Sequence, residues 1–255
     1  MARKRVVIIG GGFGGLTAAK SLPHADVVLI DRTNHHLFQP LLYQVATAAL
    51  SPGDIAWPLR TMFRSQPNVH VVMDEVVSID RTARLVSVGN GPPIAFDILV
   101  VSPGSRHAYF GHEEWEPFAP GLKTMTDAVR LRERMLSAFE EAERRRAATG
   151  KGDHLTFVIV GGGPTGVELA GALSEIGRKA MGPDFPSLQL EDLSIVLVEG
   201  GPRILPGFSE DLSAKASTAL THMGVTIRLK SLVSDVRENG VMIGEEFLPS
   251  TNVIW

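Results

Sequence analysis

The sequence predicts an α/β fold with parallel sheets, because one strand, glycine loop, helix and strand pattern occurs twice. The first copy runs from the apolar Val6–Ile9 through a glycine cluster and LTAAKSL to VVLID, residues 27–31. The second begins with TFVIVGGG, residues 156–163, continues into VELAGALSEIGRKA and ends with SIVLVE, residues 194–199. Strands joined by such a crossover lie parallel in one sheet. The chain therefore contains an internal repeat of one βαβ unit.

Between and after the two copies, apolar runs separated by Gly, Asn and Pro predict further strands. They cover residues 69–80, 83–90 and 96–105 between the copies, and VTIRL, ENGVMIG and TNVIW after them. Asn239-Gly240 is typical of a hairpin turn.

Two helices are predicted outside the repeat. Residues 124–146 have apolar side chains at helical spacing, and Thr124 with Asp127 could form a capping box. The segment SEDLSAKASTALTHMG predicts a helix with Ser209 as N-cap and Gly224 just past its end.

Composition excludes several classes of function. The 255 residues carry a formal charge of −3, which gives no basic field for nucleic acid. There is no cysteine, so thiolate catalysis, cysteine-ligated metals and disulfides are excluded. The basic start is followed by too short an apolar run for a signal peptide, and no run of about 18 apolar residues exists. These residues favour a cytoplasmic chain without a membrane span.

Both glycine clusters match G-x-G-x-x-G between a strand and a helix. In this motif the first glycine makes the turn, the second lets backbone approach a pyrophosphate, and the third allows close helix packing. Asp31 follows Gly15 by 16 residues and Glu199 follows Gly166 by 33, and such carboxylates can accept hydrogen bonds from ribose hydroxyls while repelling a 2′-phosphate. The second spacing exceeds the usual roughly 20 residues, which indicates a helix extension and loop inserted over residues 177–193. The alternative for each cluster is a tight turn without a ligand.

Two dinucleotide sites in one chain suit a hydride donor and an acceptor, and FAD with NAD is the common pairing. A further stretch bears on this pairing. HHLFQPLLYQVATAAL, residues 35–50, has no charged residue and is interrupted by Pro40, so a partner other than water is expected for it.

The order of these motifs resembles the two-dinucleotide-binding flavoprotein reductases, the pyridine nucleotide-disulfide reductase-like superfamily. Its dithiol members carry a redox cysteine pair after the first acidic strand, where this chain has none. The segment HxFQPLLYQVAT, together with GGGPTGVELAG and VEGGPRILPGF, instead resembles the corresponding segments of type II (non-proton-pumping) NADH dehydrogenases. The resemblance implies two Rossmann-like dinucleotide-binding domains, the FAD domain discontinuous and the NAD domain inserted in it. The expected bounds are 1–120 for the first part of the FAD domain, 121–244 for the NAD(H) domain, and 245–255 for the return to the FAD domain.

The resemblance also implies a set of site residues. Those expected to bind FAD are Gly10, Gly12, Phe13, Gly14, Gly15, Asp31, Arg32, Gln39, Pro40, Leu41, Tyr43, Val76 and Gly104. Those expected to bind NAD are Gly161, Gly163, Pro164, Thr165, Gly166, Glu168, Glu199 and Gly200. Glu168, expected in the first helical turn, is assigned to positioning the nicotinamide; the alternative is a carboxylate stabilised by the helix dipole.

Other residues keep simpler interpretations. Leu37, Leu41, Leu42 and Val45 could be plain core rather than a flavin wall. His35 and His36 are not expected to bind a metal, since neighbours along a strand point to opposite faces. Ser102-Pro103-Gly104 stands where the resembling family usually has A-T-G, so a threonine hydroxyl contact to the flavin is absent while the glycine is kept.

The resemblance implies hydride transfer from NADH to FAD and then two-electron delivery to a membrane quinone, without proton pumping. The chain resembles the first portion of such an enzyme. The resembling family continues past TNVIW into segments that contact quinone and bind the membrane, which would place the complete protein at the inner face of the cell membrane. Whether it forms a homodimer is open. The competing hypotheses are a reductase with ferredoxin, rubredoxin or oxygen as acceptor, and a non-catalytic NADH-binding fragment.

Overall fold

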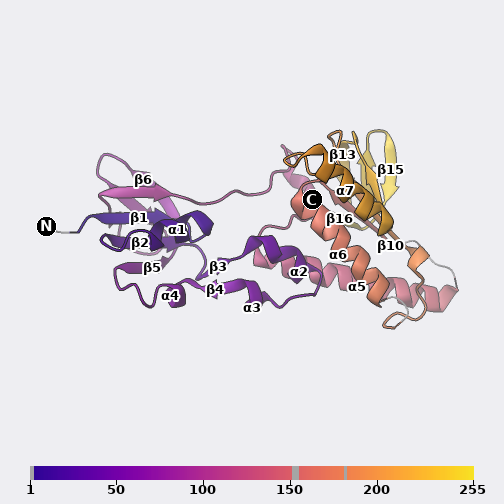
Figure 1. Cartoon of the computed structure of the whole chain (residues 1–255), viewed down its shortest axis with the longest axis horizontal. Helices are drawn as coiled ribbons and strands as arrows, with labels where there is room; N and C mark the ends of the chain where they lie inside the picture. The colour runs from indigo at the N-terminus through magenta and orange to yellow at the C-terminus, as the bar shows by residue number, and fades with distance from the viewer. Residues whose placement is uncertain (1–2, 151–154, 181–182) are drawn as a thin grey trace. The chain divides into compact units, whose positions relative to one another are not determined.

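The chain divides into two units in the computed structural model, which describes residues 3–150, 155–180 and 183–255. The first unit comprises residues up to Phe38 together with Gly53–Arg106, and the second comprises Gln39–Pro52 with His107–Trp255. Each unit contains one parallel sheet and one three-stranded antiparallel sheet (Figure 1). The predicted α/β class is therefore confirmed.

The first unit is built on the first copy of the repeat. Its parallel sheet has the order β5 (Val69–Met73), β2 (Asp26–Asp31), β1 (Arg5–Ile9) and β9 (Ile98–Val101), with α1 (Phe13–Lys20) as the first crossover. The β-branched residues of β1 and β2 are buried on both faces of the sheet, as parallel strands require. This burial fixes the glycine loop between β1 and α1 to a rigid core.

Shorter elements complete the first unit. They are the antiparallel sheet β6 (Val76–Asp80), β7 (Leu85–Val88) and β8 (Ile94–Ala95), the pair β3 (His35–Leu37) and β4 (Ala56–Pro58), and the helical turns α3 (Pro52–Ile55) and α4 (Leu59–Met62).

The second unit repeats the arrangement. Its parallel sheet has the order β12 (Val225–Arg228), β11 (Leu193–Val198), β10 (Leu155–Val160) and β16 (Asn252–Ile254). The helices are α5 (Met125–Thr149), α6 (Pro164–Ala180) and α7 (Glu210–His222), and the antiparallel sheet is β13 (Val233–Arg237), β14 (Gly240–Ile243) and β15 (Glu246–Pro249). Short turns are η1 (Gln39–Leu41), α2 (Leu42–Ala46), η2 (Glu113–Trp115) and η3 (Leu190–Asp192).

The local signals predicted from sequence hold with one exception. Thr124 and Asp127 form the capping box of α5, and the hairpin at Asn239-Gly240 joins β13 to β14. Gly224 follows α7 with a φ of +82°. Ser209 occupies the N-cap of α7, but its side chain makes no capping hydrogen bond. Residues 181–182 of the predicted inserted loop lie outside the described residues.

The compact units divide the chain at other residues than the domains expected from sequence. The division falls after Arg106 rather than after residue 120, and β16 belongs to the second sheet because it pairs parallel to β10, with Val253 opposite Val158. Both valines are buried in one cluster. The functional assignment of the domains stays a prediction.

Candidate dinucleotide-binding sites

The two glycine loops have the same backbone geometry. The amide of Gly10 donates to the carbonyl of Ile30 at 2.8 Å, and the amide of Gly161 donates to that of Val198 at the same distance. Each bond ties the start of the loop to the end of the neighbouring strand. The repeat seen in the sequence is therefore a repeat in three dimensions.

Four glycines are required by the protein's own backbone, two by their φ angles and two by close contacts. Gly10 and Gly161 adopt φ values of +100° and +108°, which side chains rarely tolerate. A Cβ at Gly15 would lie 1.8 Å from the carbonyl oxygen of Gly10, and one at Gly166 would lie 2.0 Å from that of Gly161. The first and third glycines of each motif thus close the loop against its helix.

Gly12 and Gly163 differ from these. A Cβ built at either position would meet no atom within 4 Å. The protein itself leaves room for a side chain at these two positions. The absence of a side chain therefore leaves space for a ligand that approaches the loop from outside. Each stands directly before a helix, where unpaired amides and the helix dipole favour an anion.

Both strand-end carboxylates hold the middle glycine of their loop. Asp31 Oδ2 accepts the amide of Gly11 at 2.6 Å, and Glu199 Oε2 accepts the amide of Gly162 at 2.7 Å. Sequence reasoning missed these two glycines, although the triple glycine in both copies is a signal for them. Each carboxylate therefore ties its loop to the end of the acidic strand, at the edge where a ribose would be bound.

The second oxygen of each carboxylate is also engaged. Asp31 Oδ1 accepts the amide of Thr33 at 2.7 Å, and Glu199 Oε1 accepts the amide of Gly201 at 2.6 Å. A carboxylate oxygen has more than one acceptor site, so both side chains keep capacity for a hydroxyl donor.

Both loops lie where the strand order of their sheet reverses. In the first unit this point falls between β1 and β9, and in the second between β10 and β16. In open α/β sheets, ligands bind at the carboxyl ends of strands at such a point. Ser102, the residue after β9, lies against the first loop, and its hydroxyl donates to the carbonyl of Ile9 at 3.1 Å.

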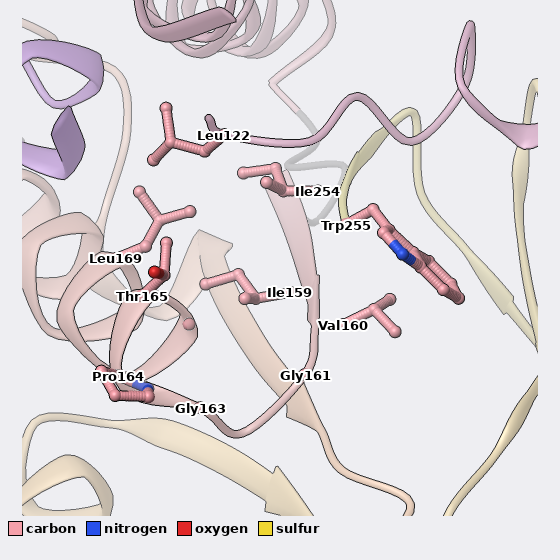
Figure 2. A pocket seen from close by; sticks show the side chains of 11 residues that line it. Leu122, Ile159, Val160, Gly161, Gly163, Pro164, Thr165, Leu169, Ile254 and Trp255 are labelled. Carbon is pink, nitrogen blue, oxygen red and sulfur yellow. The ribbon is translucent and has the colours of Figure 1, made fainter. Parts of the chain in front are cut away.

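A cavity of about 210 Å³ lies at the second reversal point. Figure 2 shows side chains from α6, from the ends of β10 and β16, and from the segment before α5 gathered around it. The lining residues are Leu122, Ile159, Val160, Gly161, Gly163, Pro164, Thr165, Gly166, Leu169, Ile254 and Trp255. The cavity joins a mainly apolar wall to the glycine loop, which suits a ligand with an apolar ring and a phosphate.

The remaining FAD candidates of the first unit occupy varied positions. Phe13 is 46% exposed beside the loop, and Gly14 has room for a Cβ only in contact with Ser102. Arg32 is exposed, with its guanidinium 4.0 Å from a carboxylate oxygen of Glu75. Val76 is half-buried at the start of β6. Gly104, with a φ of +75°, faces open space.

The FAD candidates Gln39, Pro40, Leu41 and Tyr43 belong to the second unit. Gln39 and Pro40 are exposed, whereas Leu41 and Tyr43 are half-buried. The Gln39 amide donates to the carbonyl of Lys123 at 3.4 Å, and the Tyr43 hydroxyl accepts from Gln44 at 2.9 Å.

Within the stretch from His35 to Leu50, the apolar side of α2 is covered by helices. Helix α2 packs against α5 and α6. Leu42 and Val45 are buried, so their interpretation as core is confirmed. His36 is buried too, and its imidazole bonds to the carbonyl of Gly11.

Glu168 departs from its expected place. Helix α6 begins at Pro164, so Glu168 stands in the second turn rather than the first. Partial desolvation raises its pKa above the usual 4.5. The helix dipole, which acts within the first turn, does not dominate this carboxylate.

Gly200 lies between the acidic strand and the following loop. A Cβ there would be 2.7 Å from a methyl of Leu232, whose side chain is 73% exposed.

Within the described part of the chain, no helix is both long and apolar enough to cross a membrane.

The fold and the two loops define a protein with two Rossmann-like dinucleotide-binding sites. The chain belongs to the pyridine nucleotide-disulphide oxidoreductase family, whose model matches residues 4–250. This confirms the superfamily resemblance seen in the sequence.

Individual relatives extend the comparison. The chain is 44% identical over 246 residues to the type II NADH:quinone oxidoreductase Ndh of Mycobacterium tuberculosis, covering 94% of this chain and 53% of that protein. It is 44% identical over 251 residues to NdhA of the same organism, covering 96% and 53%. The structure of NDH2 from Plasmodium falciparum in complex with NADH superimposes with a TM-score of 0.89 at 21% identity, over all of this chain and 55% of that one. The chain spans about half the length of these relatives.

Proposed function

We propose that the complete protein is an FAD-dependent NADH dehydrogenase that reduces a membrane quinone without pumping protons. The observation that carries this proposal is the pair of glycine loops, each held by a strand-end carboxylate, in a chain without cysteine. Two such sites suit a hydride donor and an acceptor, and this chain itself offers no thiol as a relay. The 44% identity to two mycobacterial type II NADH:quinone oxidoreductases supports the choice of quinone.

The first loop fits FAD. The open space at Gly12 allows the pyrophosphate to approach the backbone, and Asp31 keeps acceptor capacity for the adenosine ribose. Gly104 offers a second stretch of bare backbone after β9. When bound, FAD supplies the two-electron chemistry, and the chain supplies binding and orientation.

The second loop fits NADH. Gly163 leaves room for the pyrophosphate, and the carboxylate of Glu199 accepts ribose hydroxyls while repelling the 2′-phosphate of NADPH. The cavity beside the loop is bounded by Ile159, Leu169 and Leu122, and these side chains offer an apolar wall to a bound nucleotide.

Glu168 is proposed to position the nicotinamide. It stands one turn after the loop, on the helix that lines the cavity. Partial desolvation raises its pKa above that of an ordinary glutamate. Its carboxylate oxygens can accept a hydrogen bond from the nicotinamide.

For the whole protein we propose attachment to the inner face of the cell membrane. The chain covers 53% of its mycobacterial relatives, so contacts to quinone and membrane are assigned to the part of their length that it does not span. A homodimer is compatible with this proposal.

The first test is the visible spectrum of the purified chain, followed by anaerobic NADH. A flavin spectrum that bleaches with NADH, and much less with NADPH, is the expected result. A protein that is colourless as purified, and colourless again once unbound flavin has been removed after incubation with FAD, would contradict FAD binding by this chain. For the acceptor, a short-chain quinone should reoxidise the reduced full-length protein well above the oxygen background. No such reoxidation would reject quinone in favour of another acceptor.

A further inference from the structure

His36 contacts the first glycine loop at Gly11, the residue whose amide is bound by Asp31. The imidazole is 4% exposed, and its Nδ1 lies 3.0 Å from the carbonyl oxygen of Gly11. A carbonyl oxygen can only accept, so Nδ1 carries the proton and donates it. The ring of Phe13 stands perpendicular to the imidazole at a centroid distance of 4.9 Å. Both ends of Gly11 are therefore fixed, its amide by Asp31 and its carbonyl by His36.

The carbonyl of Gly11 shares one peptide plane with the amide of Gly12. In a trans peptide these two groups point in opposite directions. A bond that fixes the Gly11 carbonyl therefore also fixes the direction of the Gly12 N–H. Gly12 is the residue whose Cβ position is open, where the backbone can approach a pyrophosphate. A donor to the carbonyl also polarises the peptide and strengthens its N–H as a donor.

The second copy of the repeat has the same constraint from a different donor. The carbonyl of Gly162 accepts the backbone amide of Leu205 at 2.7 Å. In both copies the middle glycine is thus held by a carboxylate at its amide and by an N–H at its carbonyl. In the first copy a side chain provides that N–H, so there a side-chain substitution can remove it without changing the backbone.

The geometry points to His36 as a positioning residue that aims the Gly12 amide at the pyrophosphate of FAD. This inference rests on the proposed function, because it requires FAD in the first unit. His36 acts through Gly11 and need not touch the cofactor. A simpler interpretation is a buried histidine that only fills space in the core, and it predicts a different response to substitution.

Two variants separate these interpretations. His36→Leu removes the donor and keeps an apolar side chain, whereas His36→Asn keeps a side-chain N–H close to the position of Nδ1. His35→Leu is the matched control, because among the described residues the His35 ring bonds to its neighbour Asn34 and not to the glycine loop. For each variant of this chain we would measure the FAD dissociation constant, the ³¹P spectrum of bound FAD, the melting temperature without ligand, and the NADH dissociation constant.

The expected result has three parts. His36→Leu raises the FAD dissociation constant about tenfold, the loss expected when one charge-assisted hydrogen bond, from the Gly12 amide to the pyrophosphate, is weakened. It also shifts the ³¹P resonances of bound FAD. His36→Asn restores both values toward those of the parent chain. NADH binding is unchanged in all variants, because the second loop takes its donor from Leu205.

Four outcomes would overturn the inference. In the first, His36→Leu binds FAD as tightly as the parent does. In the second, His36→Leu and His36→Asn weaken FAD binding equally, which would assign the effect to packing. A loss of FAD affinity matched by an equal loss of NADH affinity and of melting temperature would mean general unfolding. A parent chain that binds NADH but no added FAD would overturn the proposed function of the first loop and this inference with it.

Discussion

Gly163 and Gly166 lie three residues apart, and the structure gives each a different reason to be glycine. A Cβ at Gly163 meets no atom within 4 Å, whereas one at Gly166 lies 2.0 Å from the Gly161 carbonyl. We expect Gly163→Ala to leave the melting temperature unchanged and to weaken NADH binding at least tenfold, since a methyl would block the pyrophosphate. Gly166→Ala should lower both the melting temperature and the affinity for NADH. Thermal melts and NADH titrations of the two variants test this, and equal melting losses would contradict it.

Glu199 sets the preference between the two nicotinamide cofactors in the proposed site. Its charge repels a 2′-phosphate, and both of its oxygens hold loop amides. We expect Glu199→Gln to lower the ratio of the NADPH to the NADH dissociation constant about tenfold. Asp31→Asn makes the same change in the first loop and should leave this ratio unaltered. An unchanged ratio in Glu199→Gln would refute the assignment.

Glu168 should contribute to stability in a pH-dependent way. Desolvation raises its pKa in the folded chain above the unfolded value near 4.5, so the folded state binds this proton more tightly. Its favourable contribution is complete below that value and is lost as the pH rises through the folded-state pKa. We expect the melting temperature of Glu168→Gln, relative to the parent, to rise across this window and then level off. Glu175→Gln, beside Lys179 on the same helix, should show no such rise.

At the scale of elements, the N-terminus of α5 shows what local sequence can specify. Thr124 Oγ1 accepts the amide of Asp127 at 3.2 Å, and the Asp127 carboxylate accepts the amide of Thr124 at 2.7 Å. We expect Thr124→Ala to lower the free energy of unfolding by about 1 kcal/mol in urea melts. The control is Thr221→Ala, since Thr221 is exposed inside α7 and its hydroxyl bonds only to the preceding turn. Equal effects of the two substitutions would mean that the capping box contributes nothing.

The capping box, the hairpin and both glycine loops could be predicted because each depends on residues close together in the chain. Other contacts join distant residues and leave no such pattern. The bond from His36 to Gly11 spans 25 residues, and Leu205 reaches Gly162 from the loop after the acidic strand. Glu168 was misplaced by a turn, because the spacing around Gly166 does not reveal that α6 begins at Pro164.

At the scale of the whole molecule, the order of motifs was enough to predict two similar units, whereas the bounds of the compact units depend on packing. Residues 39–52 belong to the second unit because α2 buries Leu42 and Val45 against α5 and α6. The strand of residues 252–254 joins the second sheet through its pairing with β10. Both assignments depend on which apolar surface a short segment finds after folding, and a linear pattern does not contain that information.

Two units with separate cores and separate glycine loops should respond separately to their ligands. Trp57 lies in the first unit, whereas Trp115 is buried in the core of the second, so variants retaining one tryptophan each report one unit. At a hundredfold excess over its dissociation constant, a ligand stabilises the unit it binds by about 2.7 kcal/mol. We therefore expect NADH to raise the melting midpoint seen by Trp115 and to leave that seen by Trp57 nearly unchanged. FAD should raise the midpoint seen by Trp57 more than that seen by Trp115, because four of its expected contacts lie in the second unit. If either ligand moved both midpoints equally, the chain would unfold as one cooperative body, and binding at one loop would stabilise both units.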